Sequence, residues 1–256
     1  MRFNRLITLS FITAVLFITA CRTKEKPVVP VTPVLPVGHM DVTFNNQMGG
    51  KPISFSTMTN INAVGDTYSV NTLKYYITSF SLIKSDSTKV NYPIYKLINA
   101  RDSSTCVLNL DTIPNGDYVI ARFNLGLDSS HNYTGLQTGD LDPSMGMFWD
   151  WNTGYKFFIH EGFFLDSNSA TNLLLYHYAT TPFMITIDIA IPSAIKINGN
   201  SRKLQINLDL KTLYSYPNII KFRDNNIHES LLFGDRGWLD EMRTNFRSAF
   251  TLGGVQ

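Results

Sequence analysis

Charged side chains and cysteines are scarce in this 256-residue chain. Charged residues make up 16% of it, and only two cysteines occur. Apolar residues reach 44%, with 17 Phe and 12 Tyr among them, which excludes the composition of an intrinsically disordered chain. Aromatic side chains suit a pleated, half-buried surface, so the composition favours β structure.

An excess of basic side chains is also missing. The formal net charge is +2, but Arg2 and Arg5 lie in a segment that we expect to be removed. The remaining chain then carries 20 basic and 20 acidic side chains. Proteins that bind nucleic acid normally carry a basic excess, because Lys and Arg displace counterions from phosphates. The sequence therefore argues against nucleic acid as a partner.

Motifs of common enzymes are absent from the sequence. It has no Gly-x-Ser-x-Gly, no phosphate-binding loop, no paired-cysteine metal signature and no zinc-protease helix. Cys106 follows Thr105 in a strand-like run, which favours a buried, small hydrophobic residue over a nucleophile. A glycosidase would need two carboxylates beside a cleft, and Glu161 has no evident mate. We expect a protein that is not an enzyme.

The amino terminus has the pattern of a secretory signal. Arginines precede an apolar run from Leu6 to Ile18, which is shorter than the roughly 20 residues that span a bilayer. The run ends in Ile18-Thr19-Ala20-Cys21, which resembles the bacterial lipobox. The resemblance implies a signal peptide over residues 1–20 and lipidation of Cys21, which would make the lipid bilayer a partner of the chain.

The residues after Cys21 predict a tether. Arg22 stands where many lipoproteins of the inner membrane have Asp, so we expect an outer-membrane lipoprotein that faces the periplasm or the cell surface. Prolines then recur at every third position, as Pro27, Pro30, Pro33 and Pro36. This spacing matches the turn of polyproline II, and proline cannot join the interior of a sheet. Residues 21–37 are therefore expected to form a semi-rigid spacer.

Residues 38–256 have the pattern of one β domain. In the run 203–210, Leu204, Ile206, Leu208 and Leu210 alternate with polar residues, which predicts a strand with one buried face. Similar runs occur at 40–44, 68–83, 93–98, 106–110, 118–125 and 183–191, and Gly- or Asn-rich turns separate them. Many short strands predict an antiparallel β-sandwich or barrel-like domain.

The carboxyl-terminal segment has helical periodicity instead. Leu239, Met242, Phe246 and Ala249 recur at intervals of three or four residues, so they would share one face of a helix. Acidic residues come early and Arg247 comes late, as the helix dipole favours. This pattern predicts a short C-terminal helix of about three turns that closes one end of the sheet.

The most unusual segment is 139–162, which reads GDLDPSMGMFWDWNTGYKFFIHEG. Trp149 and Trp151 would share one face if the stretch is extended, and an aromatic hairpin in the core is the simplest interpretation. The stretch MFWDWNTGYKF, together with Gly65-Asp66-Thr67 before it and Tyr176-His177 after it, resembles the MbnP-like family. The resemblance covers nearly all of 39–256.

The resemblance implies a β-rich secreted fold, copper bound by histidines near an oxidised tryptophan, and a di-haem cytochrome peroxidase-like partner that converts the tryptophan to kynurenine. His177 and His228 fit family positions best and are the implied copper ligands, since neutral imidazole suits copper. Trp149 and Trp151 are the candidates for modification. Many relatives have a histidine in the first strand, where this chain has Asn45-Asn46.

One alternative function remains beside the copper hypothesis. It is a metal-free accessory binding or assembly lipoprotein of the outer membrane, which the tether and the lipid anchor favour.

The other histidines and some acidic residues are expected to have structural roles. His39, His131 and His160 do not fit the family pattern and are expected to be structural or exposed. Asp128, Asp140 and Asp142 could ligate a hard cation such as Ca²⁺, although such acids more often stabilise loop turns.

Overall fold

The computed structural model describes residues 36–230 and 235–256, and every structural statement below concerns these ranges. The chain divides into two compact units, Met1–Val34 and Leu35–Gln256, and all described elements belong to the second. The signal peptide over residues 1–20, Cys21 and nearly all of the tether over 21–37 lie outside the described residues. No helix of the described part is long and apolar enough to cross a membrane.

One sheet is built around the first strand. Its order is β15-β13-β1-β2, and β7 also pairs with β1. The strands are β1 (Val37–Met48), β2 (Lys51–Pro52), β7 (Val107–Pro114), β13 (Ser201–Asp209) and β15 (Phe250–Val255). The pairing of β1 with β13 is parallel and the others are antiparallel. The alternation predicted for β13 is confirmed, because Leu204, Ile206 and Leu208 are fully buried.

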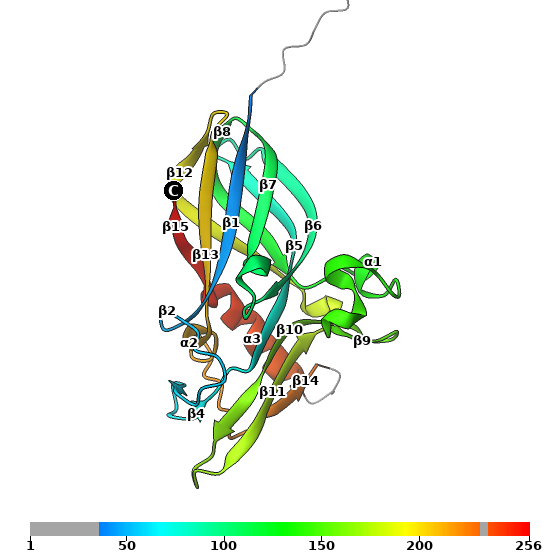
Figure 1. Cartoon of the computed structure of the whole chain (residues 1–256), viewed down its shortest axis with the longest axis vertical. Helices are drawn as coiled ribbons and strands as arrows, with labels where there is room; N and C mark the ends of the chain where they lie inside the picture. Colours follow the sequence, from blue (N-terminus) through cyan, green and yellow to red (C-terminus); the bar gives the residue numbers. More distant parts are fainter. Residues whose placement is uncertain (1–35, 231–234) are drawn as a thin grey trace, which may run out of the picture. The chain divides into compact units, whose positions relative to one another are not determined.

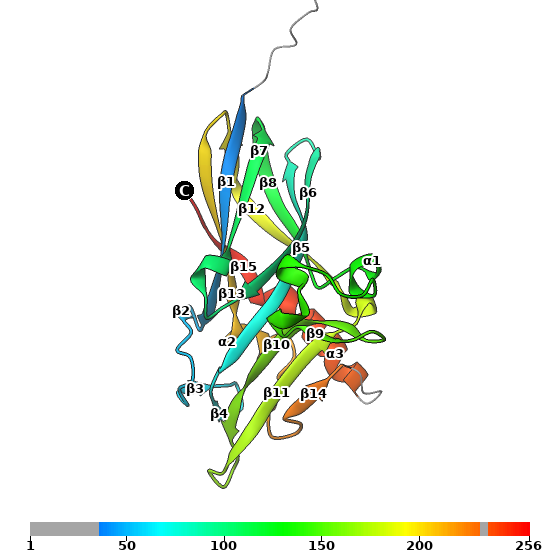
Figure 2. The ribbon, with the colours of Figure 1, turned by 45° about the vertical axis from the view of Figure 1, so that its right-hand side comes forward.

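The second sheet runs in the order β12-β8-β5-β10-β11-β14 (Figures 1 and 2). Its main strands are β5 (Thr72–Lys84), β8 (Gly116–Leu125), β10 (Gly154–Leu165), β11 (Thr171–Ala179), β12 (Ile185–Ile197) and β14 (Ile227–Glu229). Off this path lie β3 (Asn60–Ile61), β4 (Thr67–Tyr68), β6 (Lys89–Asn99) and β9 (Phe148–Asp150). All pairings in this sheet are antiparallel except that of β11 with β14.

Aromatic side chains join the two sheets. Phe123 of β8 meets Phe44 of β1 with ring centroids 5.5 Å apart, and it meets Phe250 of β15 at 5.3 Å. Tyr75 of β5 also packs edge-on against Phe250, at 5.9 Å. Edge-to-face contacts at these separations stabilise a core beyond the burial of apolar area. The predicted class, a mainly β sandwich or barrel-like domain, is confirmed.

Helices are few and short except near the carboxyl end. They are α1 (Ser129–Asn132), α2 (Leu210–Leu213) and α3 (Arg236–Ala249), with single turns of 3-10 helix η1 (Ser103–Cys106), η2 (Gly139–Leu141), η3 (Pro143–Met145) and η4 (Thr181–Phe183). In Figure 1, α3 is the long red helix that runs beside β10 and β11. The helix predicted at the carboxyl end is thereby confirmed.

The apolar face of α3 covers one face of the β10–β11 pair. Phe246 lies 5.0 Å from Phe158 of β10 and 5.2 Å from Tyr178 of β11, measured between ring centroids. The face predicted from the helical spacing, Leu239, Met242, Phe246 and Ala249, is buried as expected. The helix therefore divides this part of the sheet into a covered face and a face that it leaves open.

Replacing Phe246 tests how strongly α3 depends on this contact. Phe246→Ala should lower the free energy of unfolding by about 3–5 kcal/mol, because it removes a fully buried ring and leaves a cavity. The measurement is urea unfolding of the purified chain, followed by tryptophan fluorescence. Arg247→Ala, at the neighbouring exposed position, is the control and should change stability by about 0.5 kcal/mol or less. Equal effects of the two substitutions would contradict the packing described.

Candidate functional site

The pairing of β11 with β14 decides where the two implied copper ligands point. These strands run parallel, with Tyr176 opposite His228 and His177 opposite Glu229. Residues opposite one another share a face of the sheet, whereas successive residues point to opposite faces. His177 and His228 therefore lie on neighbouring strands with their imidazoles on opposite faces. The structure does not bring them together around one ion.

His177 lies on the face that α3 leaves open. Its Nε2 donates a hydrogen bond to Oε1 of Glu161 at 2.9 Å, and only 6% of its side chain is exposed. A carboxylate only accepts hydrogen bonds, so this contact requires the proton on Nε2. The hydrogen bond from His177 also holds the pKa of Glu161 below its ordinary value, which keeps the carboxylate ionised.

The second nitrogen of His177 is left without a partner. Nδ1 is buried and makes no hydrogen bond to any described residue. The nearest described carboxylate is that of Glu229, whose Oε1 lies 4.0 Å from Nδ1. That separation is too long for a hydrogen bond. With the proton on Nε2, Nδ1 carries a lone pair that no described residue satisfies.

Trp149 packs edge-on against His177. The ring centroids lie 5.7 Å apart with an interplanar angle of 65°, and Nζ of Lys156 lies 5.6 Å from the centroid of Trp149. The strand β9 brings the indole to this place by pairing with the start of β10. We refer to Glu161, His177, Trp149 and Lys156 as the His177 cluster.

The turn between β9 and β10 requires a glycine. Gly154 has φ +75°, and a Cβ there would lie 2.4 Å from the backbone oxygen of Asn132. The side chain of Asn132 in turn accepts the N–H of Tyr155 at 2.8 Å. Gly154 therefore allows the turn between β9 and β10 to pack closely against Asn132 of α1.

Trp151 occupies a different environment from Trp149. Strand β9 ends at Asp150, whose carboxylate accepts the N–H groups of Asn152 and Thr153 and turns the chain. Trp151 lies in this turn, 63% exposed, and packs against Phe148 at 6.1 Å. The extended stretch that would have put both indoles on one face is thus interrupted, and only Trp149 reaches His177.

His228 lies on the opposite face, under α3. Its Nδ1 is 2.8 Å from Oδ1 of Asp235, and its ring stacks on Trp238 with centroids 4.3 Å apart. Burial lowers the pKa of His228, while the Asp235 carboxylate opposes this shift. His228 and Trp238 line a cavity of about 350 Å³, together with Asn225 and Glu241. We refer to His228, Asp235 and Trp238 as the His228 cluster.

No local pattern in the sequence marks Trp238, Asp235 or Glu229 as site residues. Asp235 and Trp238 reach His228 across the connection from β14 to α3, where no spacing rule applies. Glu229 reaches His177 through the pairing of two strands that lie about 50 residues apart in sequence. A period-two pattern would have placed Glu229 and His228 on opposite faces, but it could not tell which strand lies beside them.

The three histidines that do not fit the family pattern each contact polar groups of described residues. His160 is fully buried: the Tyr214 hydroxyl donates to its Nδ1 at 2.6 Å, and its Nε2 donates to the Ser69 carbonyl at 3.2 Å. His39 is half-buried between Asp41 and Asp111, and His131 is half-buried beside Asp128.

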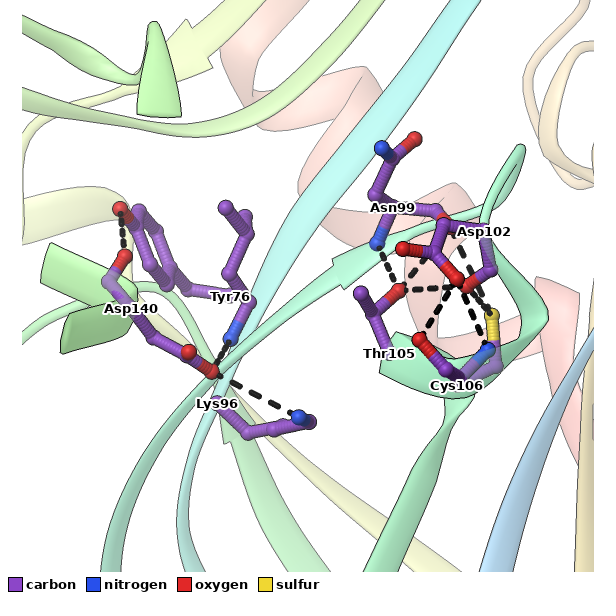
Figure 3. A network of polar contacts seen from close by, with 9 residues as sticks. Tyr76, Lys96, Asn99, Asp102, Thr105, Cys106 and Asp140 are labelled. Carbon is purple, nitrogen blue, oxygen red and sulfur yellow. Dashed lines mark hydrogen bonds and ion pairs between the residues drawn. The ribbon is translucent and has the colours of Figure 1, made fainter. Parts of the chain in front are cut away.

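Asp128 and Asp140 stabilise loops. The carboxylate of Asp128 caps α1, and that of Asp140 accepts the N–H of Leu97 at 2.8 Å and lies 3.7 Å from Nζ of Lys96. Figure 3 shows the backbone carbonyl of Asp140 meeting the Tyr76 hydroxyl as well, at 2.9 Å. These contacts tie the loop to β5 and β6, which agrees with the structural interpretation of the two acids.

Cys106 is buried, as the sequence predicts. Its Sγ lies 3.7 Å from the backbone carbonyls of Asn99 and Asp102, at the end of η1 (Figure 3). Burial raises the pKa of the thiol, which keeps it protonated at neutral pH. A protonated, buried thiol is a poor nucleophile.

The first strand carries two neighbouring amides, Asn45 and Asn46. Asn46 accepts the Tyr75 hydroxyl at 2.9 Å, and its amide nitrogen lies 3.7 Å from Sγ of Cys106. Asn45 donates to Asn207 at 3.1 Å. Both amides line a cavity of about 540 Å³. Among the described residues, no group of three or more His, Cys, Asp or Glu side chains is arranged to hold a metal ion.

Together these features define a class: a two-sheet β domain whose open sheet face carries a carboxylate–histidine–indole cluster. A model of the MbnP family matches residues 37–230, and the chain belongs to this family. The solved structure of MbnP from Methylosinus trichosporium is similar, with a TM-score of 0.51 and 15% sequence identity over 71% of this chain and 79% of that chain. Comparison with curated proteins found no match.

The buried His160 gives the stability of the domain a defined pH dependence. Burial lowers the pKa of His160 to about 4, whereas an unfolded histidine has a pKa of about 6.5. Between these values the unfolded chain binds a proton that the folded chain does not, so stability falls as pH falls from 6.5 to 4. The expected loss is on the order of 3 kcal/mol.

Urea unfolding at several pH values measures this loss. His160→Gln provides the comparison, because its amide can still contact Tyr214 and Ser69 but does not titrate. The variant should lose less stability than the original chain between pH 6.5 and 4, whatever its stability at neutral pH. Identical pH profiles for the two chains would show that His160 is not the group responsible.

Proposed function

We propose that this protein is a membrane-anchored MbnP-like lipoprotein that binds copper at His177 and presents Trp149 for oxidation by a di-haem cytochrome peroxidase-like partner. The observation that carries the proposal is the contact of Trp149 with His177. Trp149 lies within the sequence stretch most typical of the family. An imidazole beside an indole is the pairing that the family resemblance implies. The lipobox ending in Cys21 supports the anchor at the outer membrane, with the domain facing the periplasm or the cell surface.

His177 fits the chemistry of a copper ligand better than His228. Ligating histidines usually donate their other N–H to a carboxylate, which sets the tautomer and the ring orientation. His177 has this arrangement with Glu161, and its second nitrogen has no described partner. His228 also has a carboxylate, but its ring stacks on Trp238 under α3 on the far face. The proposal therefore assigns copper to His177 and not to both histidines.

Trp149 is a better candidate for oxidation than Trp151, because it is the indole that contacts His177. It is half-buried beside an imidazole and a lysine, whereas Trp151 lies exposed in the turn. A half-buried indole remains within reach of a partner docked on the open face. Conversion to kynurenine opens the five-membered ring, and this change would take place directly beside His177.

An apolar strip on the open face supports a second candidate function. Phe163 and Leu173 lie opposite one another on β10 and β11, and Ile227 of β14 lies opposite Leu175. Phe163, Leu173 and Ile227 are 40–45% exposed. Large exposed apolar side chains gathered on one face are typical of protein contacts. A metal-free accessory binding or assembly lipoprotein would use the same strip.

Copper titration of the full-length chain in detergent tests the metal assignment. His177→Ala should weaken copper binding roughly tenfold or more, because it removes the imidazole and its Glu161 contact. His131→Ala is the control for loss of a surface imidazole and should leave the affinity within about twofold. An affinity that His228→Ala lowers while His177→Ala does not would reverse the assignment.

Peptide mass analysis after co-expression with a di-haem partner tests the oxidation. Trp149→Phe should abolish the kynurenine mass change, because the reacting indole is gone, while Trp151→Phe should leave it in place. The two substitutions make the same chemical change two positions apart, so each controls for the other. Modification that persists in Trp149→Phe and disappears in Trp151→Phe would refute the choice of Trp149.

A further inference from the structure

The buried Nδ1 of His177 is the strongest unexplained feature of the domain. A buried polar atom without a hydrogen bond costs about 1–3 kcal/mol, so most such atoms in folded proteins have a partner. The Glu161 contact makes Nε2 the protonated nitrogen and leaves Nδ1 as the acceptor. A metal ion bound at Nδ1 would satisfy this lone pair.

The backbone holds Glu229 on the same side as Nδ1. Glu229 lies opposite His177 in the pairing of β14 with β11. The next residue, Ser230, donates to the His177 carbonyl through both its N–H, at 3.2 Å, and its hydroxyl, at 2.7 Å. Its hydroxyl oxygen also accepts the N–H of Ala179 at 2.7 Å. Glu229 is therefore attached to a fixed piece of backbone, although its side chain is 39% exposed and can rotate.

The separation of Nδ1 from the Glu229 carboxylate suits a shared ion. Bonds from a d-block ion to imidazole nitrogen and to carboxylate oxygen are each about 2.0–2.2 Å long. Two such ligands lie about 3.4 Å apart at a tetrahedral angle and about 4.2 Å apart in a line. The observed 4.0 Å falls between these limits. A small rotation of Glu229 would bring it to either geometry.

We infer that a divalent d-block ion binds between Nδ1 of His177 and the carboxylate of Glu229, while Glu161 orients the imidazole from the other side. This inference rests on the proposed role of His177 as a metal ligand and adds a second ligand and an ionic charge. One imidazole and one carboxylate form a borderline-to-hard donor set, which suits Cu²⁺ and Zn²⁺. Cu⁺ favours softer ligands, and Glu229 offers it little.

The local charge agrees with a divalent ion. Two carboxylates, Glu161 and Glu229, face His177, and Lys156 is the nearby ammonium that lies over Trp149. Lys74, the other lysine close to Lys156, directs its Nζ to the Met145 carbonyl at 2.8 Å.

Metal titration of the full-length chain in detergent, after removal of metal by a chelator, tests the inference. The probes are Zn²⁺, Cu²⁺ and Cu⁺, each added alone. Glu229→Gln should weaken binding of Zn²⁺ and Cu²⁺ roughly tenfold or more, because it removes an anionic ligand and keeps the shape of the side chain. Glu241→Gln makes the same change beside the His228 cluster and should leave both affinities within about twofold.

Two further measurements distinguish a role of Glu229 as a metal ligand from a structural role. Glu229→Gln should change the electron paramagnetic resonance spectrum of bound Cu²⁺, while Cu⁺ binding should remain within about twofold. The unfolding midpoint of Glu229→Gln should match that of the original chain, since the side chain is partly exposed. A shifted midpoint together with an unchanged Cu²⁺ spectrum would assign Glu229 to folding and overturn the inference.

The outcomes distinguish this inference from the proposed function. Copper binding that depends on His177 but not on Glu229 overturns the inference and leaves the proposed function standing. Divalent binding that depends on both residues supports the inference even if Trp149 is never oxidised. No binding of any of the three ions overturns the inference and the copper assignment together.

Discussion

The parallel pairing of β14 with β11 is the constraint on which the candidate sites depend. It sets Tyr176 opposite His228 and His177 opposite Glu229. Because side chains alternate along a strand, a register one residue different would exchange the residues on the two faces. His228 would then point away from α3, and Glu229 would point into the packed aromatic core. The cost of burying a carboxylate there makes the observed register the stable one.

The result is two clusters of similar composition in different surroundings. Each contains an imidazole, a carboxylate and an indole: Glu161, His177 and Trp149 on the open face, and Asp235, His228 and Trp238 under α3. Under the helix, stacking and burial dominate, and the pKa of His228 is lowered. On the open face the imidazole is equally buried, but it keeps an unpaired nitrogen beside a partly exposed carboxylate.

The helix α3 covers only one face of the β10–β11 pair. Its apolar side packs Phe246 against Phe158 and Tyr178, so the covered face of β10 and β11 becomes core. The other face keeps Trp149 half-buried and leaves Phe163 and Leu173 partly exposed. The copper site and the docking surface proposed above would both lie on the face that α3 leaves uncovered.

Local sequence patterns by themselves determined the β class, most strand positions and the terminal helix. Period-two alternation in β13 and three-to-four spacing in α3 report which face is buried, and that information is local. The stretch around Trp149 was enough to indicate the family. The tertiary structure alone decided that His177 and His228 separate, that Trp149 and not Trp151 meets an imidazole, and that Glu229 and Trp238 join the clusters. Those outcomes depend on which strands pair and in which register, and residues distant in the chain set that register through packing.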